Sequence, residues 1–458
     1  MTKSLKSRFV KGLGGQAVTQ AVTILLQLTT VPLLLYFWGL ELMGEWLVLT
    51  AIPAYLMLGD LGFTSATINE MTMQVARDDR QGALQTFQSS NAMLGLMCGV
   101  MAVVGGLFAG FAPMADWFGF VHLDNSDAAT VIALQIGLIV VGIQVGLINA
   151  GFVCEGAYGL GTALMAGISL TNFCLLAAMA VAGFGPVGAA AVLIIGELAG
   201  LIVMRLVLRR VAPWLKFGVT HASRRGVRQL FKPALGFVVY SVGQALNVQG
   251  VLLVVGAALG PAAVTAFNTM RMMTRFVNTL LTAYYGTVRP EISIAYGRGD
   301  MDLIRRLHAM ACQVAIWLAV VAAIGYAAIG DWILGLWTHG QVALDPWLFA
   351  GLIAAMLFYA LWFASSMVFY GTSRHHGLAW MLVAANAASV ALAYVLLDLV
   401  GLAGAGLAAA AAELTMLAYV VWRTLRMLDE SLAQWLRSVL PPPVKLVRQL
   451  LAPDRGKG

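Results

Sequence analysis

Two arginines stand four residues apart in an otherwise apolar segment, at positions 271 and 275 of 262–288. In a helix, this spacing places both on one face, with Arg271 about ten residues, or roughly 15 Å, from the outer end. An arginine facing lipid at that depth costs about 2.5 kcal/mol or more, so it should meet an anion in a water-filled cavity. A guanidinium donates paired hydrogen bonds to phosphate and keeps its charge. The alternatives are an ion pair with Glu197 or Glu413 and, for Arg275, a side chain that reaches the inner membrane surface.

Polar side chains also form a stripe on each of two other apolar segments. The stripe of segment 12–38 comprises Gln16, Gln20, Thr23 and Gln27, and that of segment 233–258 comprises Tyr240, Gln244 and Asn247. Amides facing lipid would cost about 1–2 kcal/mol each, so both stripes should face the protein interior. They either bond neighbouring helices or line a hydrated cavity that binds the hydroxyl groups of a sugar. On the second interpretation, the candidate substrate-binding residues are Gln20, Gln27, Tyr240, Gln244 and Asn247, together with Arg271 and Arg275.

Two glutamates, Glu197 and Glu413, lie in the middle of apolar segments beside glycine-rich runs. Burial of an isolated carboxylate favours its neutral form, so either residue could exchange a proton. Both are therefore candidate sites for a coupling ion. The alternative is a neutral carboxylate that bonds a neighbouring helix.

The sequence contains no recognisable catalytic or nucleotide-binding arrangement. No Ser-His-Asp or Cys-His set presents itself, and no glycine-rich loop ends in Lys-Ser or Lys-Thr. The cysteines lack metal-ligand spacing and fit small core residues: Cys98, Cys154, Cys174 and Cys312. We therefore predict a protein that is not an enzyme, with no cofactor, no metal site and no direct use of ATP.

The elements that must position these residues are membrane helices. Hydrophobic residues make up 60% of the chain and charged residues only 11%, which leaves too little polar surface for a soluble domain. The pattern predicts an all-α polytopic membrane protein with about 12 transmembrane helices, each long enough to cross the hydrocarbon core. Their expected ranges are 12–38, 42–68, 86–112, 129–153, 161–182, 187–208, 233–258, 262–288, 307–329, 347–370, 377–398 and 402–425.

The distribution of basic residues predicts the orientation. With the N-terminus inside, 26 of the 28 Lys and Arg residues fall on the cytoplasmic side, and the other two are Arg271 and Arg275. The positive-inside rule then predicts an inner-membrane protein with both termini in the cytoplasm. The net charge of +7 is mostly this topology signal, so we expect no nucleic-acid partner. After the last span, residues 429–440 have the pattern of a helix lying on the inner leaflet.

The chain also repeats itself. An offset of 221 residues maps Gly39 to Gly260, Glu70 to Glu291, Arg77 to Arg298 and Asp79 to Asp300, and an offset of 216 maps Gly185 to Gly401, Gly188 to Gly404, Glu197 to Glu413 and Arg210 to Arg426. We predict two parallel six-helix halves with a site between them, which is a transporter architecture. The expected parts are an N-terminal half (1–208), a basic cytoplasmic linker (209–232), a C-terminal half (233–426) and an interfacial tail (427–458).

Several motifs, taken in order, resemble the polysaccharide-biosynthesis (O-antigen and capsule repeat-unit) flippases of the multidrug/oligosaccharidyl-lipid/polysaccharide exporter superfamily. They are Tyr36-Phe-Trp-Gly-Leu-Glu-Leu-Met-Gly-Glu-Trp, Leu58-Gly-Asp-Leu-Gly-Phe-Thr-Ser-Ala, Arg289-Pro-Glu-Ile-Ser, Gly297-Arg-Gly-Asp, and the glycine pairs 185/188 and 401/404. The likeness spans nearly all of 10–425. It implies a MATE-like, V-shaped fold with a central cavity that is typically cationic and takes a diphosphate.

The resemblance also implies a function. Members transfer an undecaprenyl-diphosphate-linked oligosaccharide from the inner to the outer leaflet of a bacterial inner membrane, and alternating access is the expected mechanism. The expected partners are the lipid-linked oligosaccharide, membrane lipids, and a polysaccharide polymerase with its chain-length machinery. The alternative within transport is a cation-coupled multidrug exporter of the same superfamily, which would use acidic residues in the cavity and would not need Arg271.

Overall fold

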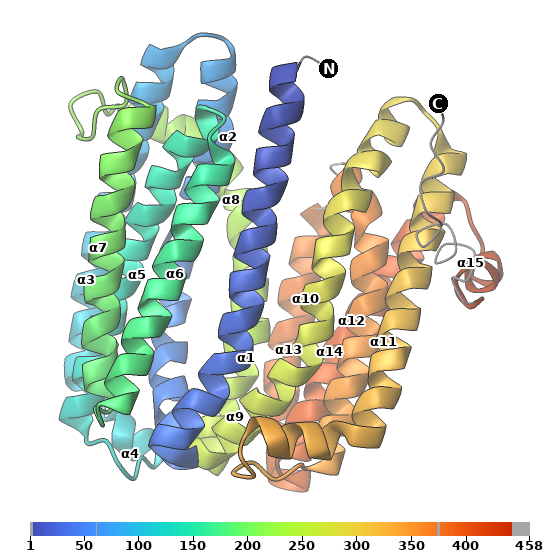
Figure 1. The fold of residues 1–458 in the computed structure, drawn as a ribbon. Coiled ribbons are helices and arrows are strands. Elements are labelled where there is room, and N and C mark those ends of the chain that lie inside the picture. Colours follow the sequence, from blue (N-terminus) through green and yellow to red (C-terminus); the bar gives the residue numbers. More distant parts are fainter. Residues whose placement is uncertain (1–2, 61, 373–375, 442–458) are drawn as a thin grey trace. The chain divides into compact units, whose positions relative to one another are not determined.

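The computed structural model describes residues 3–60, 62–372 and 376–441, and every regular element in these ranges is a helix (Figure 1). The chain forms two compact units, the first made of Met1–Ala266 with Trp337–Val342 and the second of Phe267–Leu336 with Ala343–Gly458. The all-α fold predicted from hydropathy is therefore confirmed. The six-helix halves were predicted from the repeat, and their boundary at 209–232 stays a prediction.

The first unit packs around large buried side chains such as Phe63, Phe87 and Phe152. Its helices bury the apolar side chains that the membrane-spanning pattern supplies. They are α1 (Lys3–Ala54), the 3₁₀ helix η1 (Tyr55–Asp60), α2 (Phe63–Ala76), α3 (Arg80–Phe111), α4 (Met114–Phe118), α5 (Asn125–Cys154), α6 (Tyr158–Val181), α7 (Pro186–Val211), α8 (Arg224–Ala245), the π-helix η2 (Leu246–Gly250) and α9 (Val251–Leu259).

The second unit has its own core, which includes Tyr285, Cys312 and Trp435. Trp435 comes from the predicted interfacial segment, which forms the short helix α15. The helices of this unit are α10 (Pro261–Gly297), whose first residues belong to the first unit, α11 (Met301–Trp337), α12 (Pro346–Gly371), α13 (His376–Val400), α14 (Ala403–Leu428) and α15 (Leu432–Val439).

Within the described residues, ten helices are long and apolar enough to cross a membrane, against the expected number of about 12. The predicted span 42–68 is wrong as one helix, because α1 ends at Ala54 and α2 starts only at Phe63. Pro53 lacks an N–H group, which weakens the helix at this point. Asp60 ends η1, and its Oδ1 accepts hydrogen bonds from the backbone N–H and the hydroxyl of Thr64 in the first turn of α2, at 3.1 and 2.8 Å. The predicted span 262–288 lies within α10 (Pro261–Gly297), and α10 is not among these ten helices.

The internal repeat is visible in the backbone of the two turns that follow α2 and α10. Asp78 and Gly299, which are 221 residues apart, both adopt a left-handed conformation with φ of 60° and 72°. The next residues, Asp79 and Asp300, each use Oδ1 to accept the backbone N–H three residues later, at 2.8 and 2.9 Å. Each aspartate thus caps the helix that it precedes. The two turns share a left-handed residue and the same capping hydrogen bond, which confirms their predicted equivalence.

The turns at Gly39 and Gly260, which the sequence predicts on the outer side and which we call the outer turns, repeat as closely. Gly39 interrupts α1 with φ 74° and ψ −177°, and Gly260 separates α9 from α10 with φ 80° and ψ 180°. A positive φ with ψ near 180° is accessible essentially to glycine alone, because a Cβ atom would clash with the backbone. These two glycines therefore set the direction in which the following helix leaves each turn.

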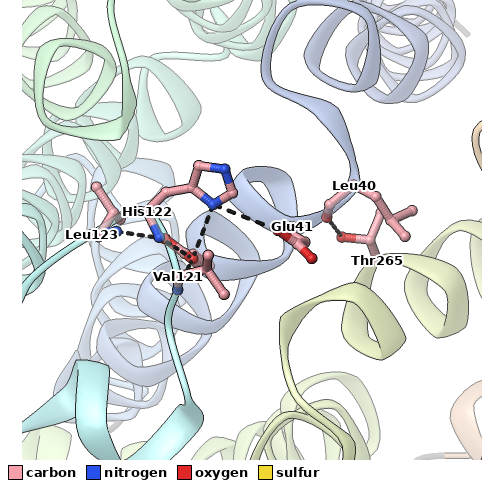
Figure 2. A network of polar contacts seen from close by, with 7 residues as sticks. Leu40, Glu41, Val121, His122, Leu123 and Thr265 are labelled. Carbon is pink, nitrogen blue, oxygen red and sulfur yellow. Dashed lines mark hydrogen bonds and ion pairs between the residues drawn. The ribbon is translucent and has the colours of Figure 1, made fainter.

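The outer turns also contact each other reciprocally. Thr265 Oγ1 donates a hydrogen bond to the carbonyl oxygen of Leu40 at 2.8 Å (Figure 2). On the other side, Gly44 lies against the backbone of Pro261, so closely that a Cβ atom on Gly44 would be 1.9 Å from the Pro261 oxygen. The offset of 221 maps Leu40 to Pro261 and Gly44 to Thr265. In each turn, the same position therefore meets the same carbonyl of the other turn.

A buried glutamate fixes an outer loop to the first of these turns. Glu45 has no exposed surface, and its carboxylate accepts the backbone N–H groups of Val121, His122 and Leu123 at 2.7, 2.9 and 3.0 Å. His122 Nδ1 lies 3.5 Å from Glu45 Oε1 and 3.9 Å from Glu41 Oε2. Three converging amides satisfy a carboxylate that would otherwise be costly to bury. We call this arrangement the outer clamp.

The segment predicted as a linker, 209–232, is bound to several side chains of α3, of which the buried Gln88 makes the most hydrogen bonds. Gln88 Nε2 donates to the carbonyl oxygen of Lys216 at 2.9 Å, and Gln88 Oε1 accepts the backbone N–H of His221 at 2.6 Å. A side-chain amide can satisfy both a donor and an acceptor of an irregular segment in this way. The linker is therefore held on the first unit at the residues between α7 and α8.

Candidate functional site

Arg271 is buried on α10, with 8% of its surface exposed. It lies ten residues after Pro261, where α10 begins, which corresponds to roughly 15 Å of helix rise. Its depth in a membrane stays a prediction. Arg271 Nη2 donates to Asn268 Oδ1 at 3.0 Å, and the guanidinium carbon lies 4.9 Å from the centre of the Phe267 ring. Two neighbours on its own helix thus orient the guanidinium, one through a neutral amide and the other through its aromatic face.

Arg275 lies one turn further along α10, near enough to repel the charge of Arg271. Tyr359 of α12 and Glu413 of α14 interact electrostatically with Arg275. With one acid beside two guanidinium groups, the cluster of Arg271, Arg275 and Glu413 has a formal net charge of one positive unit.

Glu413 is held between helices of the second unit. It is 9% exposed, and its Oε2 accepts a hydrogen bond from Trp362 Nε1 of α12 at 2.6 Å. Trp362 belongs to an aromatic group in which the Tyr359 ring lies 5.2 Å from that of Trp362 and 5.1 Å from that of Phe363. This carboxylate thus links α14 to α12 and lies in an aromatic environment.

Glu197 has a different partner in the first unit. Its Oε2 accepts a hydrogen bond from Asn172 Nδ2 of α6 at 2.8 Å. Gly196 allows this approach, because a Cβ atom there would lie 2.1 Å from Asn172 Oδ1. Both repeat-related glutamates bond a neighbouring helix, in agreement with the structural alternative. Their role as coupling-ion sites stays a prediction.

The two polar stripes belong to the first unit. Gln27 is half-buried on α1, whereas the side chains of Gln20 and Tyr240 lie outside the described part of the structure. Gln244 and Asn247 are both half-buried, and Asn247 falls within the π-helix η2 (Leu246–Gly250). π-turns inside α-helices are frequent at functional sites, and the role of Asn247 in binding stays a prediction.

Sequence reasoning missed the residues that orient the arginines. Asn268 stands three positions before Arg271, and this i, i+3 spacing could have identified it as a partner on the same face. Phe267, one position earlier, supplies the aromatic face. The contributions of Tyr359 and Trp362 depend on the packing of α12 against α14, which single-sequence spacing does not reveal. In the described ranges, no group of three or more His, Cys, Asp or Glu residues could hold a metal ion.

No protein-family model and no curated protein sequence matches the chain. Solved structures do match it. An inward-facing multidrug resistance MATE family transporter of the MOP superfamily aligns with a TM-score of 0.69 and 14% identity, over 88% of this chain and 98% of that one. A MATE structure in complex with MaD3S aligns with a TM-score of 0.62 and 13% identity, over 92% and 94%.

A third structure is a MOP superfamily transporter from Pyrococcus furiosus, with a TM-score of 0.63, 11% identity and coverage of 93% and 97%. It is described as having a binding pocket of reverse polarity that suggests a different function. At these identities the matches establish the fold. The MATE-like architecture expected from the sequence is therefore confirmed over most of the chain.

Proposed function

We propose that this MATE-fold chain is a flippase, which moves an undecaprenyl-diphosphate-linked oligosaccharide from the inner to the outer leaflet of a bacterial inner membrane. The observation that carries the proposal is Arg271, which is buried on α10 and oriented by Asn268 and Phe267, at a position that the sequence predicts near the membrane midplane. A permanent cation at that depth calls for an anion, and a diphosphate offers planar pairs of oxygens to a guanidinium.

The surrounding charges support an anionic substrate. Arg275 adds a second guanidinium one turn away, and Glu413 offsets only one of the two positive charges. A binding site for a cationic drug would be expected to carry a net negative charge instead. The pocket of reverse polarity described for the Pyrococcus furiosus transporter supports the idea that this fold accommodates cavities of different charge.

The choice of a lipid-linked sugar rests on the ordered motifs from Tyr36 to Gly404 and on the polar stripes. In this proposal Gln20, Gln27, Tyr240, Gln244 and Asn247 face the sugar, since amides and a phenol bond hydroxyl groups. The substrate would move by alternating access between the two halves, with no chemical conversion of the oligosaccharide. A polymerase and chain-length machinery would then receive the oligosaccharide on the outer side.

A cation-coupled multidrug exporter is the second candidate, because two of the matched structures are described as MATE proteins. Such an exporter would require carboxylates that are exposed in a cavity, where they could bind the coupling cation or the drug. Glu413 instead bonds Trp362, and Glu197 bonds Asn172. These hydrogen bonds favour the flippase over the exporter.

The test replaces Arg271 by Ala and by Lys in a strain that lacks the native protein, with surface polysaccharide as the readout at matched protein levels. We expect Arg271→Ala to lower polymer at least about tenfold, as for loss of a buried charge contact, and Arg271→Lys to restore part of it. Arg423→Ala is the matched control, because Arg423 is exposed on α14 and donates to Tyr419. Full polymer with Arg271→Ala, together with lost efflux of a cationic dye, would favour the exporter instead.

A further inference from the structure

The second unit contains an apolar groove that the proposed transport does not use. Its volume is about 550 Å³, and its walls come from α11, α12, α14 and α15. The lining is almost wholly apolar and includes Leu361, Leu417, Trp422 and Leu436. In a membrane-spanning chain, such a surface stays in contact with hydrocarbon.

Helix α15, which forms one wall of the groove, is firmly attached to the second unit. Ser431 and Gln434 form a capping box at its start. Trp435 is buried, with its ring stacked 6.4 Å from that of His308 on α11. At the other end, Trp317 Nε1 donates to the carbonyl oxygen of Leu440 at 3.1 Å. Both ends of α15 are thus fixed, so the groove that it borders is part of the folded unit.

The groove is polarised along α14. Leu417 and Arg426 both line it, and they are nine residues apart, or roughly 14 Å by helix rise. Leu417 marks the apolar end, which lies toward the middle of the helix. Arg426 marks the charged end in the last turn, which the positive-inside rule assigns to the cytoplasmic surface. A phospholipid of the inner leaflet has the same order, with its chain inward and its headgroup at the surface.

The charged end offers one group of each sign. The guanidinium carbon of Arg426 lies 4.4 Å from the centre of the Trp422 ring, which orients the cation at the rim. Glu430, just beyond α14, also lines the groove. Burial raises the pKa of the Glu430 carboxyl, while the charge of Arg305 acts in the opposite direction. A ligand cation beside Glu430 would favour its ionised form.

We propose that this groove binds a zwitterionic glycerophospholipid of the phosphatidylethanolamine type. One acyl chain lies along α14 from Arg426 to Leu417, the phosphate meets Arg426, and the ammonium meets Glu430. A volume of about 550 Å³ suits one acyl chain, whereas an undecaprenyl chain is far longer. The site is thus separate from the substrate site proposed above, and it does not depend on the flippase function.

The test is native mass spectrometry of the purified full-length protein, with phosphatidylethanolamine or phosphatidylglycerol added in turn. We expect retention of the ethanolamine lipid and weaker retention of the glycerol lipid. Ala418→Phe should abolish retention of both by filling the groove, whereas Ala391→Phe, on an exposed part of α13, should not. Arg426→Gln should lower the retention of both lipids about tenfold, and Arg423→Gln should leave the retention of both unchanged.

Glu430→Gln separates the two headgroups. It should remove a preference of about fivefold for the ethanolamine lipid and should leave retention of the glycerol lipid unchanged. Equal retention of both lipids by the unaltered protein would overturn the proposal, as would undiminished retention by Ala418→Phe. Binding that appeared only after removal of residues 442–458 would assign the groove to the chain's own tail. Because the readout is lipid retention, failure here would leave the Arg271 test unaffected.

Discussion

The two outer turns share one backbone but support different side chains. Gly39 and Gly260 have nearly the same φ and ψ, and the positions 40/261 and 44/265 meet reciprocally. Beyond the first turn, Glu45 forms the outer clamp, whereas the equivalent residue after the second turn is Ala266. Conversely, Arg271 and Arg275 correspond to Thr50 and Ala54 in the first half. The repeat thus supplies one geometry, and each half uses it for a separate task.

The largest expected effect comes from disturbing the reciprocal contact at its tightest point. In Gly44→Ala, the new Cβ would lie 1.9 Å from the backbone oxygen of Pro261, so one turn must move away from the other. We expect a loss of about 3 kcal/mol in the free energy of unfolding, as for overpacking against backbone. Chemical unfolding of the purified protein in detergent measures this loss. Gly95→Ala, whose Cβ meets no described atom within 4 Å, is the control, and an equal loss there would contradict the explanation.

The outer clamp tests the asymmetric part of the comparison. Glu45→Ala leaves three backbone N–H groups without their acceptor, and we expect a loss of about 2 kcal/mol because water from the outer side restores some bonds. Hydrogen exchange at residues 121–123 should increase at the same time. Glu41→Ala, an exposed neighbour that contacts only the His122 ring in this network, should have little effect. Unchanged exchange in the Glu45 variant would show that the clamp does not hold the loop.

A smaller effect is expected from the other side of the reciprocal contact. Thr265→Val keeps the shape of the side chain but removes the hydrogen bond to the Leu40 carbonyl. The expected loss is about 1 kcal/mol, the usual net value for one such bond. Thr415→Val, which removes a bond within one exposed helical turn, serves as the reference. Equal midpoints of thermal unfolding for the two variants would mean that the bond between the turns contributes nothing extra.

The smallest effect concerns the inner turns, where one half uses aspartate and the other glycine. Asp78 adopts φ 60°, a conformation that glycine adopts at no steric cost, and Gly299 occupies the equivalent place. Asp78→Gly should therefore stabilise the protein by about 0.5 kcal/mol, and Gly299→Asp should destabilise it by a similar amount. Chemical unfolding of both variants measures the change in the free energy of unfolding, which should have opposite signs. Changes of the same sign in both variants would refute the equivalence of the two positions.

Much of the fold follows from local sequence. Long apolar runs specify the spans, and a constant offset identified the glycines of the outer turns and the capping aspartates of the inner turns. In each case, the signal lies within a single segment or in a match between two segments of the same chain.

The remaining features depend on contacts between distant segments. Glu45 binds residues 76 to 78 positions further on, and no local pattern pairs an acidic outer residue with a particular loop. Likewise, Trp362 and Glu413 are 51 residues apart and meet only because α12 packs against α14. The division of the span 42–68 was missed because mean hydropathy does not register how Pro53 and Asp60 change the backbone.

The reciprocal contact between the outer turns has the form of an isologous interface, in which residue i of one copy meets residue j of the other and the reverse. Such a contact arises between two identical chains around a two-fold axis. In a homodimer, positions 44 and 265 would have been one residue, obliged to fit both sides at once. When both copies belong to one chain this obligation is lifted, so glycine can occupy one side of the contact and threonine the other.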